Sequence, residues 1–247
     1  MLTGSTLKVN LKALLKTFSM RININSLILK IISIVFVSFL AFGCEKDNGV
    51  TVTDIDGNVY AGITIGSQVW MATELKTTKF RDGSAIPAVT DNVAWGNLTT
   101  PGMCDYGNTA ANAATYGKLY NWYAVADPRG LCPEGWHVPA EPEWVNLFTA
   151  LGSADVAGGK MKEVGTTHWS SPNSSATNES GFTGLGGGYR NYQGVFKDFS
   201  YNVGYWSSTP SNTGYAMYVG LWFMNAWVDN YALDKKSGIN VRCIQDM

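Results

Sequence analysis

The hydrophobic pattern divides the chain into an apolar N-terminal segment and a longer part with short, strand-like alternation. An uninterrupted, largely apolar run covers residues 31–42 and stops at Gly43-Cys44. Beyond it, β-branched and aromatic residues spaced through 51–70 predict short strands, with turns at Asp56-Gly57-Asn58 and at Gly66-Ser67. The pattern therefore predicts a β-rich domain behind an apolar leader.

Helical periodicity is limited to two segments. Residues 116–125 predict one helix, and a second is expected to begin around Pro142, which suits a first helical turn, and to end at Gly152. Residues 81–114 predict mostly loop, and residues 181–243 predict short strands and loops. The expected fold class is α+β, loop-rich, with small twisted antiparallel sheets and about two helices.

The N-terminal segment has the features of a bacterial lipoprotein signal. Residues 1–43 carry five basic and no acidic side chains, and the apolar run of 12 residues is short for a membrane span. Cys44 follows the small Gly43 and is the expected lipidation site and first mature residue. Ala41 stands where such signals prefer leucine, Met20 offers an alternative start, and a plain secreted protein or an anchor helix stays open.

Downstream of the signal, residues 44–53 are expected to form a tether and residues 54–247 a single domain, since no repeat or charge block divides them. The acidic-plus-lysine stretch at residues 45–48 resembles the export signal that sends lipoproteins to the cell surface in Bacteroidota, although a solvated tether would have the same composition. The expected location is the outer membrane, through a lipid anchor.

Composition narrows the partners. Without the five basic residues of the leader, 13 basic residues face 19 acidic ones, a net charge of −6 that disfavours nucleic acid. Charged residues make up only 15% of the chain and aromatic residues 13%, with nine tryptophans. These rings fill a core and also offer flat surfaces for sugars.

Five motifs follow one another along the chain: Tyr60–Met71, Gly117–Val125, Trp136-His137-Val138-Pro139, Gly204–Thr209 and Val241-Arg242-Cys243. In this order they resemble the motifs of the Fibrobacter succinogenes major paralogous domain, and the resemblance covers about residues 56–246. The last three also resemble those of formylglycine-generating-enzyme-like domains. This second resemblance implies a C-type-lectin-like architecture with irregular loops held by buried tryptophans.

Three cysteines remain after the predicted lipidation site. In an oxidising envelope two of them are expected to pair, and we favour Cys132 with Cys243 because both lie in the strongest motifs. Cys104 is then free or buried, and the other pairings stay open. The reactive cysteine pair of formylglycine-generating enzymes has only Cys243 as a counterpart, so that activity is not expected.

No metal, cofactor or catalytic set is predicted. His137 is expected to be structural and His168 exposed, and the zinc spacings are missing. Residues 184–190 lack the ending of a phosphate-binding loop and predict a tight turn. The triplets that hold calcium in C-type lectins are only partly matched at 141–143 and 227–230.

An aromatic segment near the C-terminus is the better candidate for ligand binding. Exposed rings there stack on sugars, and neighbouring amides and carboxylates bond hydroxyl groups. The leading hypothesis is a non-catalytic, lipid-anchored module for glycan or a surface protein. One alternative is a polysaccharide-acting enzyme, which would need two facing carboxylates among Asp127, Glu134, Glu141 and Glu143. Another is a structural adhesion protein, which would need a large exposed apolar patch. The candidate residues are Trp222, Asn225, Trp227, Asp229, Asn230 and Tyr231.

Overall fold

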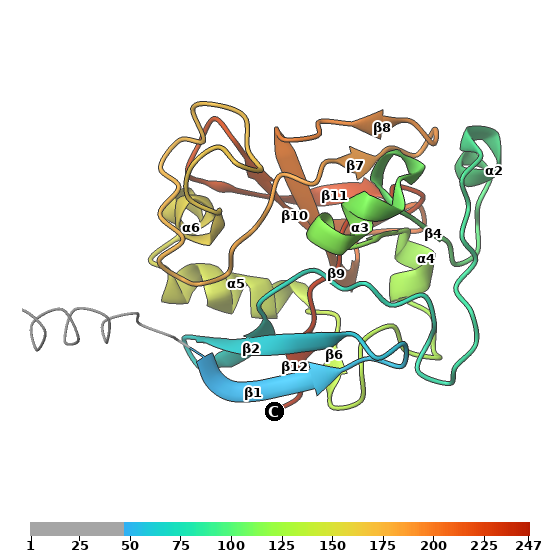
Figure 1. Ribbon diagram of the computed structural model, residues 1–247, viewed down its shortest axis with the longest axis horizontal. Coiled ribbons are helices and arrows are strands. Elements are labelled where there is room, and N and C mark those ends of the chain that lie inside the picture. The colour runs from blue at the N-terminus through green and yellow to red at the C-terminus, as the bar shows by residue number, and fades with distance from the viewer. Residues whose placement is uncertain (1–46) are drawn as a thin grey trace, which may run out of the picture. The chain divides into compact units, whose positions relative to one another are not determined.

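The computed structural model describes residues 47–247 (Figure 1). They form four small antiparallel sheets, five helices and one 3-10 turn joined by long loops, a mixed α+β fold. Only two of these helices exceed seven residues. The helices are α2 (Asn92–Gly96), α3 (Ala110–Tyr116), α4 (Trp122–Val125), α5 (Glu141–Ala150) and α6 (Ala154–Met161), and the 3-10 turn is Tyr106–Asn108.

A five-stranded sheet brings the beginning and the end of this part of the chain together in the order β1-β2-β3-β12-β6. Its long members are β1 and β2, and the other three strands are two to four residues long (Figure 1). The strands are β1 (Asp47–Thr53), β2 (Val59–Ile65), β3 (Gln68–Met71), β6 (Trp136–His137) and β12 (Ile244–Gln245).

The second main sheet is the meander β11-β10-β9, and two-stranded pairs complete the set. In Figure 1 the hairpin β7–β8 lies beside this meander, and a bridge from Gly188 to Val203 joins the two. The strands are β4 (Met103–Cys104), β5 (Leu119–Tyr120), β7 (Tyr189–Arg190), β8 (Phe196–Lys197), β9 (Asn202–Pro210), β10 (Tyr215–Trp222) and β11 (Val228–Asp234).

The predicted tether needs correction. Its described part, 47–53, is strand β1, which pairs with β2 from Thr53↔Val59 outward. The turn between the strands is fixed by Asp54, whose Oδ1 accepts hydrogen bonds from the backbone N–H groups of Asp56 and Asn58. The turn at Asp56-Gly57-Asn58 was expected. It reverses the chain, so that the residues in front of it pair with β2 as a strand.

The predicted helix over 116–125 is wrong. Helix α3 ends at Tyr116 because Gly117 takes a φ of 71°, and a Cβ there would lie 2.4 Å from Glu74. The chain then forms strand β5, and α4 begins only at Trp122. The prediction failed because the apolar residues of strand β5 and helix α4, taken together, have the spacing expected of one continuous helix.

The helix expected around Pro142 is present as α5, with Pro142 in its first turn. Helix α6 was missed because its Gly158-Gly159 pair has low helix propensity. Strands β9 to β11 are also longer than the short strands expected there.

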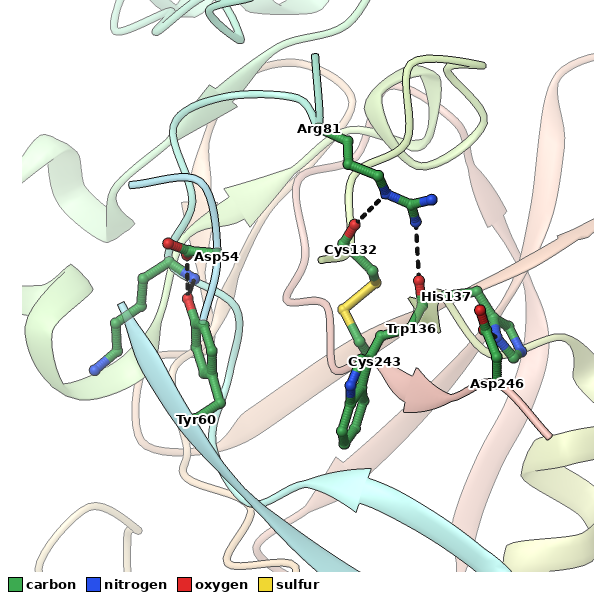
Figure 2. The surroundings of a disulfide bond; sticks show 9 residues. Asp54, Tyr60, Arg81, Cys132, Trp136, His137, Cys243 and Asp246 are labelled. Carbon is green, nitrogen blue, oxygen red and sulfur yellow. Dashed lines mark hydrogen bonds and ion pairs between the residues drawn. A yellow bond between two sulfur atoms is a disulfide. The ribbon is translucent and has the colours of Figure 1, made fainter. Parts of the chain in front are cut away.

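The disulfide between Cys132 and Cys243 is confirmed, with 6.0 Å between the two Cα atoms. Figure 2 shows Arg81 beside it, donating hydrogen bonds of 2.9 Å to the carbonyl oxygens of Cys132 and Trp136. Cys104 is free and buried, and burial raises the pKa of its thiol to about 12. The disulfide therefore fastens the C-terminal strand to the middle of the chain.

Buried cations hold the irregular loops. Arg190 is fully buried and donates to the carbonyl oxygens of Val89, Thr90 and Gly194. Arg242 is also fully buried, and its guanidinium pairs with Glu74 at 2.5 Å. Arg190 thus supplies donors to three loop carbonyl groups, and Arg242 also donates to the carbonyl oxygen of Phe182.

Candidate functional site

One face of the meander gathers several of the predicted ligand-binding residues. Side chains alternate along strands, and the register Tyr218↔Tyr231 and Gly220↔Asp229 places Tyr218, Trp222, Asp229 and Tyr231 on the same face. We call these four residues the aromatic face. Gly220 lies between the two aromatic side chains of β10, and the ring of Tyr218 covers it, 3.1 Å from where a Cβ would stand.

Asp229 fixes the orientation of two of these rings. It is 9% exposed, and its Oδ2 accepts a hydrogen bond of 2.6 Å from Nε1 of Trp222. Its Oδ1 accepts a second one of 2.9 Å from the hydroxyl of Tyr231, which raises the pKa of that phenol. The ring of Tyr231 is nonetheless 56% exposed. Asp229 thus holds an exposed ring in one orientation, which lowers the entropy lost on binding.

Trp227 is displayed by the turn of the β10–β11 hairpin, residues 223–227, called the hairpin loop below. Its indole is 51% exposed. The amide of Asn225 faces it, and in the orientation that satisfies both groups the amide accepts from Nε1 of Trp227 at 3.3 Å and donates to its carbonyl oxygen at 3.2 Å. Asn225 therefore supports Trp227 from within the same loop.

Lys162 holds the hairpin loop from beneath. The side chain is fully buried, and its ammonium donates to the carbonyl oxygens of Ser174, Trp222 and Asn225 at 2.8–2.9 Å. Among the described residues no carboxylate forms an ion pair with it. Burial lowers the pKa of Lys162 to about 8.

The glycine pair Gly158-Gly159 of α6 allows the hairpin loop to pack closely against this helix. A Cβ on Gly158 would lie 2.5 Å from the carbonyl oxygen of Trp227, and one on Gly159 would lie 2.5 Å from that of Ser175. The N–H of Gly159 donates to the carbonyl oxygen of Ala226 at 2.9 Å. Sequence reasoning missed these supporting residues. The signal that could have found the glycines is their pairing at 158–159 within a helical segment, where larger side chains are expected.

Not every predicted site residue belongs to this group. Asn230 points to the opposite face of β11, and its Nδ2 lies 3.4 Å from Oε1 of Glu141 at the start of α5. The structure therefore brings together Trp222, Asp229 and Tyr231, and places Asn225 and Trp227 on the adjoining hairpin loop.

The four carboxylates considered for an enzyme have separate surroundings. Asp127 pairs with Arg129 at 2.8 Å. Glu134 lines a cleft of about 230 Å³ beside the disulfide, and Glu143 lines another of about 220 Å³. Within residues 47–247 no group of three or more His, Cys, Asp or Glu residues is arranged to hold a metal ion.

The two histidines both lie between charged or aromatic partners. His137 contacts Asp246 through Nδ1 at 2.5 Å and Glu143 through Nε2 at 2.9 Å (the first is drawn in Figure 2). The expectation that His168 is merely exposed is wrong. It is half-buried, and its Nδ1 lies 2.8 Å from Glu163.

The predicted lipidation site, Cys44, lies outside the described residues. No helix in the described part of the chain is long and apolar enough to cross a membrane.

Comparison with known proteins gives one result. Residues 63–245 match the Fibrobacter succinogenes major domain. No curated protein and no solved structure matches the chain.

Proposed function

The chain belongs to the Fibrobacter succinogenes major domain family, and we propose that it is a lipid-anchored, non-catalytic module that binds glycan at the surface of a bacterial envelope. The observation that carries this proposal is the pair of exposed rings, Trp227 and Tyr231, each held in one orientation by a polar neighbour. Sugar-binding sites use such flat, fixed rings, because stacking on a pyranose needs a rigid apolar surface with polar groups at its edge.

The non-catalytic part of the proposal is supported by the surroundings of the carboxylates. Asp229 already accepts hydrogen bonds from two side chains, and Glu143 accepts them from His137 and from the backbone N–H of Ala140. Glycoside hydrolysis needs two carboxyl groups on either side of one bond. Neither of the two clefts described above is lined by two of the four carboxylates considered: Glu134 shares the first with Asp54, and Glu143 shares the second with Asp246.

The test is binding of polysaccharides by the full chain, purified in detergent with its N-terminal segment. We expect one class of plant or microbial glycan to bind, and Trp227→Ala to weaken binding about ten- to thirtyfold, the usual cost of removing a central aromatic contact. Tyr215→Ala is the matched control, because this exposed tyrosine lies on the opposite face of β10. Binding should survive calcium chelation.

Failure to bind any glycan would reject this ligand class and direct the search to a surface protein partner. Equal binding by the Trp227 and Tyr215 variants would place the site elsewhere on the molecule. Loss of binding on chelation would restore a calcium-dependent mode.

The membrane anchor is proposed from the lipoprotein signal, with Cys44 as the lipidated residue in the outer membrane. Labelling of cells with a fatty-acid analogue should mark the wild-type protein and leave Cys44→Ala unmarked. Protease treatment of intact cells then tests exposure at the surface, and full protection would reject it.

A C-type-lectin-like arrangement is proposed for the fold. It is supported by the small antiparallel sheets and by loops packed on buried tryptophans, among them Trp95, whose Nε1 donates to the carbonyl oxygen of Lys236 across 141 residues of sequence. A superposition of an experimental structure on C-type lectins would test it, and a different strand order would reject it.

A further inference from the structure

A small cavity lies beside the aromatic face. Its volume is about 70 Å³, and its lining includes Tyr189 of β7, Asn202 and Gly204 of β9, and Tyr218 and Trp222 of β10. An apolar cavity of about 150 Å³ holds one benzene ring. A space half as large admits one substituent of a sugar and excludes the whole ring.

The cavity presents one hydrogen-bond acceptor with no partner in the protein. Asn202 is only 4% exposed, and its Nδ2 donates to the carbonyl oxygen of Leu221 at 3.2 Å. Among residues 47–247 none donates a hydrogen bond to its Oδ1. This oxygen is therefore free to accept a hydrogen bond from a ligand N–H group.

Two tyrosines, Tyr189 and Tyr218, line the same cavity. Their hydroxyl groups form no hydrogen bond with another described residue. Burial raises the pKa of both phenols, so they stay protonated and able to donate at neutral pH. The remaining lining is apolar and comes from Trp222, Leu233 and Ile239.

This set of groups matches one chemical substituent. An acetamido group offers one N–H donor, one carbonyl acceptor and one methyl group. Oδ1 of Asn202 would accept from the N–H, the tyrosine hydroxyls would donate to the carbonyl, and Leu233 and Ile239 would cover the methyl. We infer that the site selects N-acetylated amino sugars, with the acetamido group bound in this cavity. The inference rests on the proposed glycan binding and specifies its substrate class.

The position of the cavity favours a sugar as the carrier of the acetamido group. The ring of Tyr218 forms its wall and lies edge-to-face with that of Tyr231, 6.4 Å between centroids. On an amino sugar the acetamido group is attached directly to the pyranose, so one residue can fill the cavity while its ring reaches the exposed Tyr231. A free amino sugar fits poorly, because no carboxylate lines the cavity and an ammonium there would be buried unpaired.

Three oligosaccharides of equal length and linkage test the inference. Chitohexaose, cellohexaose and fully deacetylated chitohexaose differ only in the group at C2, which is acetamido, hydroxyl or amino. Titration calorimetry with the full chain in detergent should show chitohexaose binding at least about tenfold tighter than the other two, the worth of about one to two hydrogen bonds and a buried methyl.

Two variants locate the preference. Tyr189→Phe with Tyr218→Phe removes only the two hydroxyls, and Gly204→Ala places a methyl group in the cavity, 3.3 Å from Ile239. Both should bring the affinity for chitohexaose down towards that for cellohexaose, whereas Tyr215→Phe should keep the preference. Thermal unfolding of each variant checks that it is folded.

The outcomes separate the two proposals. Equal binding of all three oligosaccharides, or a preference that the cavity variants keep, overturns the acetamido assignment and leaves glycan binding in place. Binding of none of them, together with none of the wider panel, overturns the proposed function and this inference with it.

Discussion

Replacement of Lys162 by methionine tests how the site is supported. The ammonium donates to three carbonyl groups, two of which, in Trp222 and Asn225, bound the first part of the hairpin loop. Methionine keeps most of the side-chain volume and removes every donor. The loop would then keep its apolar contacts and lose the three hydrogen bonds from this ammonium.

The magnitude is a balance of two effects. Burial lowers the pKa of Lys162 from 10.5 to about 8, so keeping the charge in the folded state costs about 3 kcal/mol, which methionine recovers. Three buried carbonyl groups left without a donor cost about 1–3 kcal/mol each. The second effect exceeds the first, and we expect Lys162→Met to lower the free energy of unfolding by about 2–3 kcal/mol and Tm by about 5–10 °C.

Urea and thermal unfolding measure both quantities. Lys160→Met is the matched control, because that lysine lies in the last turn of α6, two residues before Lys162, and forms a partly exposed pair with Glu179, worth about 0–1 kcal/mol. Equal or greater stability of Lys162→Met would refute the reasoning, since the charge would then cost more than its hydrogen bonds return.

The pH dependence gives an independent check. The folded state releases the Lys162 proton near pH 8, whereas the unfolded state keeps it until about pH 10.5, so the unfolded state binds more protons in between. The free energy of unfolding should therefore rise by about 2 kcal/mol between pH 7 and 9.5 in the wild type relative to Lys162→Met. A constant difference would refute the buried-cation account.

Two further predictions concern the C-terminal strand. The double variant Cys132→Ser with Cys243→Ser lacks the disulfide and so opens a loop of 111 residues, which should lower the free energy of unfolding, measured in urea, by about 5 kcal/mol. Cys104→Ala is the control and should lower it less. An equal decrease in the two variants would contradict the chain-entropy argument. Burial lowers the pKa of His137, but hydrogen bonds to two carboxylates outweigh this and raise it overall. The protonated His137 therefore stabilises the fold fully below pH 6.5, and this stabilisation is lost as the pH rises through the folded pKa. The decrease in Tm caused by His137→Gln should be larger at pH 5.5 than at pH 8.5. An equal decrease in Tm at the two pH values would rule out a stabilising protonated His137.

Local signals predicted part of the fold well. The Asp-Gly-Asn turn, the Pro142 helix start and the cysteine pair each depend on residues close in sequence or on one covalent rule, and all three are present. The failures have a common cause. Whether 116–125 is one helix depends on Gly117 packing against Glu74, a contact that no periodicity reveals.

The candidate site divides in the same way. Trp227 and Tyr231 could be proposed from composition, because exposed aromatics near amides are recognisable in a sequence. Asn230 and Asp229 are neighbours in β11, so their side chains point to opposite faces of the sheet. The sequence alone does not show this, because it does not reveal that both residues lie in one strand. The role of Lys162 was out of reach, since its three partners come from two distant segments.

The support of the hairpin loop has a consequence for how this surface can change. Lys162, Gly158 and Gly159 meet the loop through its carbonyl oxygens, which every amino acid possesses. Phe223 packs against the core and against Tyr201, and Asn225 supports Trp227, so the side chains least needed for the shape of the loop are those at positions 224, 226 and 227. Substitutions there can alter what is recognised at little cost in stability, so the scaffold can be diversified, by evolution or in a library, at one short stretch of sequence.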